Sequence, residues 1–397
     1  MPARDCLHGI LMAEPFKNLI NRQTVENAGK HLTRVWPKFD RARFEKLACD
    51  GLDRLELKAR AMQIADACAQ TLPQDFAHAC DVIEMALAPE VPLDAEGEPL
   101  SQDAEDRDRG LSGIIVWSLG EYVVLRGMDD VSRALECLHA LTRRASAEFS
   151  IRPFIQRHSE TTLRTLAQWA RDPSPHVRRL VSEGSRPRLP WGLRLQLFVT
   201  DPSPTLPLLR ALQDDPSAYV RRSVANHLND IAKDHPDLVA AWVREHLVSA
   251  PPTRVALLRH ASRTLIKAGH PATLEAWGLG QSLRAKVTLA LSARSVPIGG
   301  VLGLAVRLVS TAPAPQPLVI DYAVHHVRAN GERTPKVFKG WKLTLAPGEK
   351  RALAKQHSLR PVTTRRLYPG THRIDLLING QLVARREFEL LPARPKP

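Results

Sequence analysis

Trp117 and Glu121 lie four residues apart in the segment WSLGE, and the apolar flanks GIIV and YVVL predict a helix around them. This spacing places the indole and the carboxylate on one face of the helix. A glutamate between apolar flanks is either buried with a partner or lines a groove. A rim aromatic beside a solvated acid has the same spacing, so the pair alone does not establish a site.

A second group of chemically useful residues lies in and before the segment RPRLPW. It supplies Arg186, Arg188 and Trp191 from a turn stiffened by two prolines, and Trp169 ends the preceding helix. Tryptophan faces attract cations, and arginines bind phosphates. Together with Glu121, these residues could form an aromatic, acid-bearing cleft on a cationic track. The alternative is that they are divided between core and surface.

Other catalytic signatures are absent from the sequence. It has no phosphate-binding loop, no GxGxxG, no HExxH and no nucleophile elbow. The 15 histidines lack metal-ligand spacing, and the adjacent His325 and His326 lie on a predicted strand, which points them to opposite faces. The five cysteines include no CxxC pair, which favours isolated thiols over a disulfide framework or a zinc site. We expect neither a metal nor another cofactor.

The elements that must position these residues contain an internal repeat. DPSPHVRRL at 172–180 returns as DPSAYVRRS at 215–223, after 43 residues, and a weaker unit follows at 253–271. Each phrase should form a turn with serine as the helix N-cap, and Pro175 fits the first helical turn. The following valine should face inward and the two arginines outward. Helix–turn–helix units of this period are typical of HEAT-like solenoids.

The flanking regions complete the predicted fold. Residues 13–90 have helical spacing, and residues 88–110 collect the proline, glycine and acid of a surface loop. Strand patterns after residue 281, with Asn-Gly turns at 329–332 and 378–381, predict a seven-stranded immunoglobulin-like sandwich. The predicted fold class is multidomain, an all-α HEAT-like repeat solenoid followed by an all-β immunoglobulin-like sandwich. The expected divisions are a disordered extension at 1–11, a HEAT-like domain at 12–280, a basic immunoglobulin-like domain at 281–392 and a tail at 393–397.

Charge is distributed unevenly along the 397 residues, whose net charge is +14. Residues 1–140 carry a net −8, residues 141–280 a net +8 and residues 281–397 a net +14. This distribution favours a polyanionic partner bound by the last two thirds of the chain. A generally basic, solvated surface is the alternative. The candidate phosphate-binding cations are Arg178, Arg179, Arg186, Arg188, Arg221, Arg222, Arg259, Arg263, Lys336, Lys339, Lys342, Arg365 and Arg366.

Several long strings resemble one family. MAEPFKNLINRQTVENAGKHL, HVRRLVSEGSRPRLPW, YVRRSVANHLNDIAKDHP and DYAVHHVRANG are similar to AlkC-type DNA alkylation-repair proteins, and the likeness covers nearly the whole chain from Met12. Residues 1–11 fall outside it, which makes Met12 a candidate start. The resemblance implies HEAT-like repeats with a C-terminal immunoglobulin-like domain. It also implies an N-glycosylase that removes cationic alkylated bases, notably 3-methyladenine, from duplex DNA in base excision repair.

The resemblance further implies roles for individual residues. The wider superfamily places an aromatic residue four positions before a catalytic carboxylate and a second tryptophan further along, and Trp117, Glu121 and Trp191 match this pattern. The acid is glutamate where AlkD-type proteins have aspartate. Arg152 is the preferred candidate for an arginine that assists at the DNA backbone, with Arg157 as the alternative. The residues expected to contact the lesion or its sugar are Trp117, Trp169, Trp191 and Arg152.

The implied chemistry fits these residue types. Alkylation at N3 makes the purine cationic and a good leaving group, so no general acid is needed. One carboxylate can stabilise an oxocarbenium-like sugar and accept a proton from water. We expect a monofunctional, monomeric enzyme in the cytoplasm, acting at the nucleoid. Two alternatives stay open: a non-catalytic HEAT-repeat scaffold that binds DNA or an acidic protein, and a lesion-binding protein without turnover.

Overall fold

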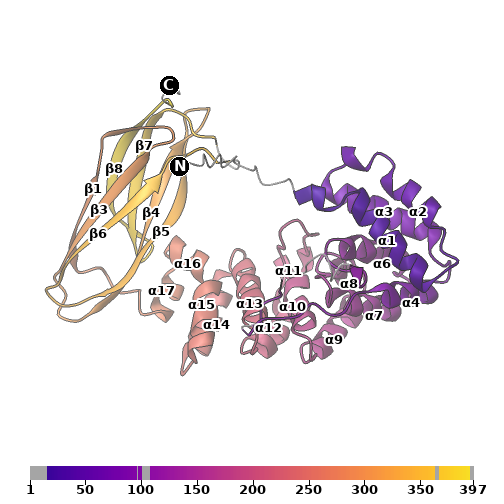
Figure 1. The fold of residues 1–397 in the computed structure, drawn as a ribbon. Coiled ribbons are helices and arrows are strands. Elements are labelled where there is room, and N and C mark those ends of the chain that lie inside the picture. The colour runs from indigo at the N-terminus through magenta and orange to yellow at the C-terminus, as the bar shows by residue number, and fades with distance from the viewer. Residues whose placement is uncertain (1–15, 96, 101–107, 363–365, 394–397) are drawn as a thin grey trace, which may run out of the picture. The chain divides into compact units, whose positions relative to one another are not determined.

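The computed structural model describes residues 16–95, 97–100, 108–362 and 366–393. Its contacts divide the chain into two compact units, Met1–Asp230 and Ile231–Pro397 (Figure 1). Trp117, Glu121 and Trp191 all belong to the first unit, so the candidate site depends on the packing of that unit.

The described part of the first unit is built from helices, as the sequence predicts. They are η1 (Phe16–Leu19), α1 (Arg22–Val35), α2 (Arg41–Cys49), η2 (Leu52–Arg54), α3 (Leu57–Thr71), α4 (Phe76–Ala86), α6 (Ile115–Arg126), α7 (Val131–Thr142), α8 (Ile151–Arg157), α9 (Ser159–Trp169), α10 (Pro175–Gly184), α11 (Gln196–Thr200), η3 (Ser203–Thr205), α12 (Leu206–Leu212) and α13 (Ala218–Ile231). Side-chain caps define several starts. Asn21 accepts the Thr24 N–H at 3.0 Å, and Asp75 accepts the His78 N–H at 2.8 Å. In the described chain, no helix is long and apolar enough to cross a bilayer.

The repeated phrases form equivalent turns between helices. Asp172, Asp201 and Asp215 each accept the backbone N–H of the serine two residues later, at 2.8, 3.0 and 2.9 Å. The Asp201 turn is a third copy of this turn, although the residues after it lack the valine and the two arginines of the repeated phrase. Val177 and Val220 are fully buried, which confirms that these positions face inward.

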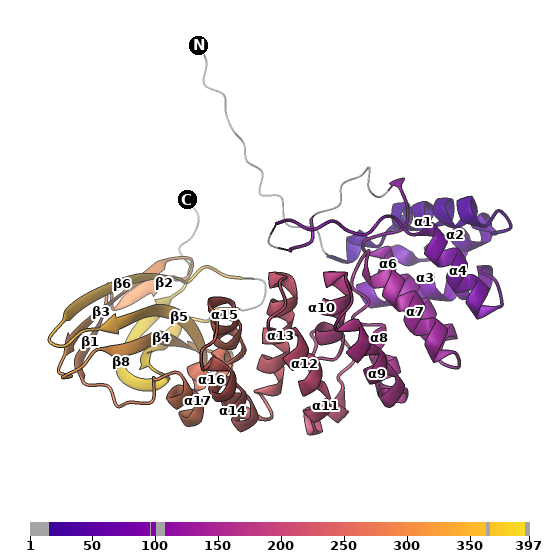
Figure 2. The ribbon, with the colours of Figure 1, turned by 90° about the horizontal axis from the view of Figure 1, so that it is seen from below.

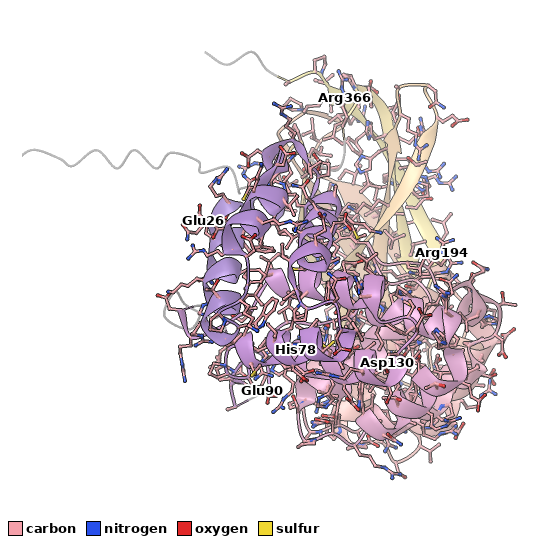
Figure 3. All side chains as sticks on the ribbon, turned by 90° about the vertical axis from the view of Figure 1, so that its right-hand side faces the viewer. Glu26, His78, Glu90, Asp130, Arg194 and Arg366 are labelled. Carbon is pink, nitrogen blue, oxygen red and sulfur yellow. The ribbon has the colours of Figure 1, made fainter. Side chains whose placement is uncertain are left out.

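The serines of the phrases do more than begin helices. Ser174 stands at the N-cap of α10, but its hydroxyl donates to the Glu90 carboxylate (labelled in Figure 3) and makes no cap hydrogen bond. Ser217 Oγ donates to the Gly97 carbonyl at 3.0 Å. Ser174 therefore occupies the predicted N-cap position, but its hydroxyl does not cap the helix. Both hydroxyls tie the described part of the acidic loop to the starts of α10 and α13.

In the residues that the structure describes, the second unit combines four helices with two sheets. Its elements are α14 (Pro236–Leu247), α15 (Pro252–Ala261), α16 (Arg263–Ala268), α17 (Pro271–Ala276), β1 (Ala285–Leu291), β2 (Ser295–Pro297), β3 (Val301–Ser310), β4 (Gln316–Val327), β5 (Arg333–Leu345), β6 (Lys350–Ser358), β7 (Gly370–Ile378) and β8 (Gln381–Leu391). One sheet has the order β1-β3-β6 and the other β2-β8-β7-β4-β5. Ile320, Ile374 and Phe388 lie in the apolar core of the sandwich.

The sandwich has one more strand than the sequence predicts. The additional strand, β2, has three residues and pairs in parallel with the end of β8. Such a short segment carries no readable alternation, so the pattern missed it. The two Asn-Gly hairpins are confirmed, since Gly331, Asn379 and Gly380 all have positive φ and join β4 to β5 and β7 to β8.

The last helices pack directly on the sandwich. In Figure 2, α15 and α16 lie beside β4 and β5. Ile266, Leu274 and Leu279 form a buried apolar cluster with Val319 of β4, and Trp277 packs against it. The contact division groups α14 to α17 with the sheets, and the boundary expected at residue 280 stays a prediction. The apolar cluster joins α16, α17 and Leu279 to β4.

Candidate active site

Glu121 and Trp117 lie on one face of α6, as their spacing predicts. Trp117 Nε1 donates to Glu121 Oε1 at 2.9 Å. Burial raises the pKa of Glu121 above its ordinary value, while the Trp117 hydrogen bond and the Lys58 charge act in the opposite direction. Gly120 permits a close approach to α8, because a Cβ there would lie 2.3 Å from Ser150 Oγ. The carboxylate is thus partly desolvated and held by one indole.

A cavity of about 430 Å³ opens beside this pair. Trp117 and Trp191 both line it, together with Phe149, whose ring centroid lies 4.9 Å from that of Trp117. Glu121 is not among the lining residues; it contacts the cavity through the Trp117 indole. Arg186 shares the lining. The structure therefore brings together residues from both sequence segments that carry candidate chemistry.

Trp191 occupies an unusual position at the rim of this cavity. Its side chain is 76% exposed, and its φ of 64° lies in the left-handed region that non-glycine residues rarely adopt. The loop around it is closed by hydrogen bonds from Gly192 N to Leu189 O and from Leu195 N to Pro187 O, both at 3.2 Å. A large aromatic held outward by a strained backbone is a feature of binding surfaces.

Arg152 lies beneath this loop and is fully buried. Its Nε donates to the Leu193 carbonyl at 2.5 Å and its Nη1 to the Gly184 carbonyl at 2.8 Å. Burial, together with the nearby Arg186 charge, lowers the pKa of Arg152 to about 10. Arg152 therefore exposes no surface through which the expected contact with DNA could form. Its guanidinium instead ties the Trp191 loop to the end of α10, whereas Arg157 is exposed.

Charged residues form a paired network in and beneath the cavity. Arg179 donates to Glu148 at 2.7 Å, and its guanidinium lies 4.8 Å from the Tyr219 ring centroid. Arg186 pairs with Glu183 at 2.5 Å and with Asp230 at 2.7 Å. Although burial acts in the opposite direction, these arginines hold the pKa of Glu183 below its ordinary value. Sequence reasoning missed Glu148, Glu183 and Phe149, since no local pattern marks them.

The repeated arginines do not form the predicted ladder of outward cations. Arg178 donates to the Asp215 carboxylate at 2.6 and 3.0 Å, and its side chain is 13% exposed. Arg221 donates to the Asp215 and Pro216 carbonyls at 2.5 and 2.7 Å. Arg222, at 50% exposure, pairs with Glu98. The outward prediction is wrong for Arg178 and Arg179, because carboxylates from other parts of the fold turn these side chains inward. Arg186, also expected to bind phosphate, is buried and paired with Glu183 and Asp230.

The remaining predicted residues are dispersed. Trp169 packs against His139, with the rings tilted and their centroids 5.3 Å apart, and does not line the cavity. Arg188 is partly exposed on the turn before Trp191. Four of the predicted cations are exposed on the second unit: Lys336, Lys339, Lys342 and Arg366, which is labelled in Figure 3. Arg365 lies outside the described residues. Arg259 and Arg263 line a separate cavity.

Comparisons with known proteins agree with this architecture. Residues 142–265 match the family described as DNA alkylation repair enzyme, and residues 285–392 match the C-terminal Ig-like domain of the uncharacterised protein YhaZ. The uncharacterised protein YhaZ of Bacillus subtilis (strain 168) is 31% identical over 376 residues, covering 94% of this chain and 99% of its own.

A solved structure gives a similar result. The Pseudomonas fluorescens alkylpurine DNA glycosylase AlkC, bound to DNA containing an abasic site analog, is 35% identical with a TM-score of 0.85. The match covers 94% of this chain and 99% of that one. With near-complete coverage in both comparisons, the helical and Ig-like parts are matched together. The chain therefore belongs to the AlkC-type family of DNA alkylation-repair proteins.

Proposed function

We propose that this protein is a DNA glycosylase that hydrolyses the N-glycosidic bond of cationic alkylated bases, notably 3-methyladenine, in duplex DNA. Family membership and the similarity to AlkC support an alkylation-repair glycosylase. The observation that carries the finer proposal is the partly buried Glu121 carboxylate, held 2.9 Å from Trp117 Nε1 beside a cavity lined by Trp117, Phe149 and Trp191.

The bond breaks without acid catalysis in this proposal. The electron pair of the C1′–N bond leaves with the base and neutralises its positive charge, while positive charge develops on the sugar. The ionised Glu121 stabilises that charge and accepts a proton from the attacking water, whose oxygen forms the new bond to C1′. Because Trp117 occupies one carboxylate oxygen, the other oxygen is the one available to water.

The aromatic faces provide selection for charged lesions. A cation over a tryptophan face is stabilised by roughly 0.5–2 kcal/mol, depending on desolvation. A neutral base gains little from this interaction. The exposed Trp191 and the cavity-lining Trp117 are the faces that we assign to this role, and Arg152 acts through the loop that positions Trp191.

Base release from methylated duplex DNA tests the proposal. We expect the full-length protein to release 3-methyladenine in the presence of EDTA and to leave an abasic site with both strands intact. Unmethylated duplex DNA of the same sequence is the control. Tight binding without base release would favour the scaffold or the lesion-binding alternative, and strand cleavage would exclude a monofunctional hydrolase.

A further inference from the structure

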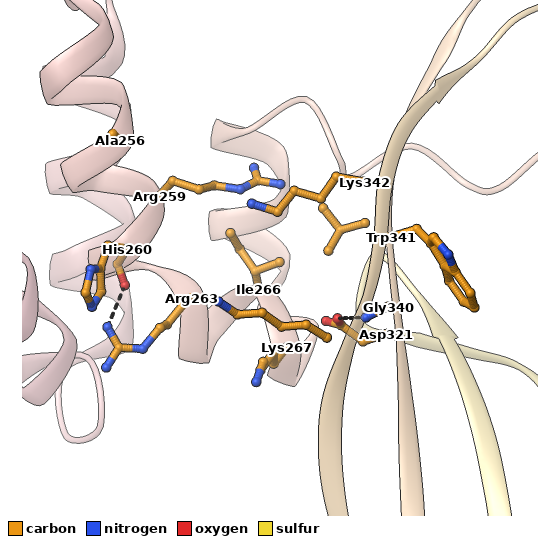
Figure 4. Close-up of a pocket in the computed structure, with 12 residues that line it drawn as sticks. Ala256, Arg259, His260, Arg263, Ile266, Lys267, Asp321, Gly340, Trp341 and Lys342 are labelled. Carbon is orange, nitrogen blue, oxygen red and sulfur yellow. Dashed lines mark hydrogen bonds between the residues drawn. The ribbon is translucent and has the colours of Figure 1, made fainter. Parts of the chain in front are cut away.

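A second cavity, of about 660 Å³, lies entirely within the second unit (Figure 4). Its walls are α15 and α16 on one side and β4 and β5 on the other. The charged side chains that line it are Arg259, Arg263, Lys267, Lys339, Lys342 and Asp321. Five cations therefore surround one carboxylate. No residue of the Trp117–Trp191 cavity takes part.

The helical cations come from two successive helices. Arg259 lies in the last turn of α15, and Arg263 and Lys267 lie four residues apart on one face of α16. All three line the same cavity. Arg259 is also placed by Trp277, since its guanidinium lies 4.8 Å from that ring centroid.

The sheet cations converge because of a β-bulge. Lys339 pairs with Asp321 and Trp341 with Ile320, which leaves Gly340 as the extra residue of β5. A Cβ at Gly340 would lie 2.4 Å from the Ile320 carbonyl oxygen, so the bulge requires glycine. In a regular strand, residues three apart face opposite sides. The bulge resets this alternation and turns both Lys339 and Lys342 toward the cavity.

The charges in this cavity are poorly balanced. In Figure 4 the ends of Arg259 and Lys342 point toward each other. Within the part of the chain that the structure describes, neither forms a salt bridge, and Arg259 contacts the Trp277 ring instead. The Asp321 carboxylate accepts the Gly340 N–H at 3.3 Å. Burial lowers the pKa of both cations, Arg259 and Lys339 lower that of Lys342 further, and the single Asp321 carboxylate opposes these shifts without reversing them. An anion between them would relieve this repulsion.

We propose that this cavity binds a phosphate group, with Arg259 and Lys342 as its principal contacts. The guanidinium and ammonium groups enter this cavity from several directions. They can therefore contact the tetrahedrally arranged oxygens of a phosphate better than the two coplanar oxygens of a carboxylate. The phosphate has two possible sources with the same chemistry. One source is the DNA backbone, and this assignment rests on the proposed function. The other is a free phosphate or phosphate monoester, and this assignment is independent of the proposed function.

The test compares two charge-matched double variants of the full chain. Arg259→Gln with Lys342→Gln removes the facing cations, and Lys286→Gln with Arg307→Gln removes one lysine and one arginine from exposed positions on β1 and β3. Lys342→Gln alone is a second cavity variant, chosen because this side chain is exposed. Melting temperature is measured in inorganic phosphate against chloride at equal ionic strength. Affinity for unmodified duplex DNA is measured over a salt series.

We expect phosphate to raise the melting temperature of the wild type and the control variant more than that of the cavity variants. For a backbone phosphate, the cavity double variant also lowers the slope of log affinity against log salt by about one to two relative to the control. If the cavity double variant loses the rise in melting temperature with phosphate but binds DNA like the control variant, the ligand is a free phosphate. Equal behaviour of cavity and control variants in both assays overturns the proposal. Base release plays no part, so a failure of the proposed function is seen separately.

Discussion

The ionisation and orientation of Glu121 are controlled by different neighbours. Its burial raises its pKa, whereas the Trp117 N–H favours the ionised form and fixes one oxygen at 2.9 Å. A partly desolvated carboxylate interacts more strongly with a developing cation than a hydrated one does. Since the glutamate must be ionised to act, its pKa sets the acidic limit of the proposed reaction.

Trp117→Phe should move that limit toward higher pH. The substitution removes the N–H donor that lowers the Glu121 pKa, so a larger fraction of the carboxylate is protonated at any given acidic pH. We expect the acid limb of the single-turnover rate profile to shift upward, in addition to a lower plateau. Trp169→Phe is the control, because Trp169 does not line the cavity. An unshifted acid limb would mean that Glu121 does not govern it.

Glu121→Gln should stabilise the protein at neutral pH. The folded-state pKa is raised above the unfolded one, so the folded state binds the proton more tightly and loses stability as pH rises through the folded pKa. The amide avoids this loss, and we expect a higher melting temperature than for wild type at neutral pH. The difference should disappear below the unfolded-state pKa. Glu136→Gln, at a side chain 67% exposed, is the control; a lower melting temperature for Glu121→Gln contradicts the assigned environment.

At the scale of elements, the repeated phrase connects one turn to the next. Asp215 accepts the Ser217 N–H within its own turn and also accepts two guanidinium hydrogen bonds from Arg178 of α10. Arg178 in turn donates to the Asp172 and Pro173 carbonyls at 2.9 Å. The repeat interval of 43 residues therefore matches a charge pair between the Asp172 and Asp215 turns as well as a stack of helices.

Asp215→Ala should be strongly destabilising. It leaves the largely buried Arg178 without its carboxylate, and breaking a buried pair in this way costs about 3–5 kcal/mol. Asp201→Ala removes the same turn hydrogen bond from an exposed position, where the loss should be near 1 kcal/mol. Denaturant unfolding followed by circular dichroism measures both. Equal losses would show that the turn, rather than the ion pair, explains the repeated aspartate.

How much the sequence reveals differs between local and distant interactions. Trp117 and Glu121 could be paired from spacing, and Val177 could be placed inside, because a helix fixes both relations locally. The direction of the repeated arginines could not be predicted, since the carboxylates that receive them come from other turns, as Asp215 does for Arg178. The burial of Arg152 likewise depends on a loop 41 residues away in sequence.

At the scale of the whole molecule, the last helices and the sandwich share a small apolar core beside the main core of the sandwich. Asn379 Nδ2 donates to the Leu279 carbonyl at 3.1 Å, and Asn379 Oδ1 accepts the Val319 N–H at 2.8 Å. Gly269 and Gly380 also approach closely, because a Cβ on Gly380 would lie 2.3 Å from the Gly269 Cα. Both apolar and polar contacts therefore join α16 and α17 to β4 and the β7–β8 turn.

Truncation tests this shared core. A chain of residues 234–397 should unfold cooperatively, because it retains the cluster around Val319. A chain of residues 281–397 exposes Val319 and leaves Asn379 without its Leu279 partner, so its free energy of unfolding should be lower by about 1–3 kcal/mol. Denaturant titration of the two chains gives the comparison. Equal stability would make residues 281–397 an independent domain to which the helices contribute nothing.

The most direct test of the account is the single-turnover rate of base release by Glu121→Gln on DNA containing 3-methyladenine, with DNA affinity measured on the same preparations. We predict a rate lower by on the order of 10²–10³, typical for the loss of one positioned electrostatic group, with DNA affinity within about twofold of wild type. A rate near that of wild type would contradict the assignment of Glu121 as the group that stabilises the sugar and accepts the proton from water.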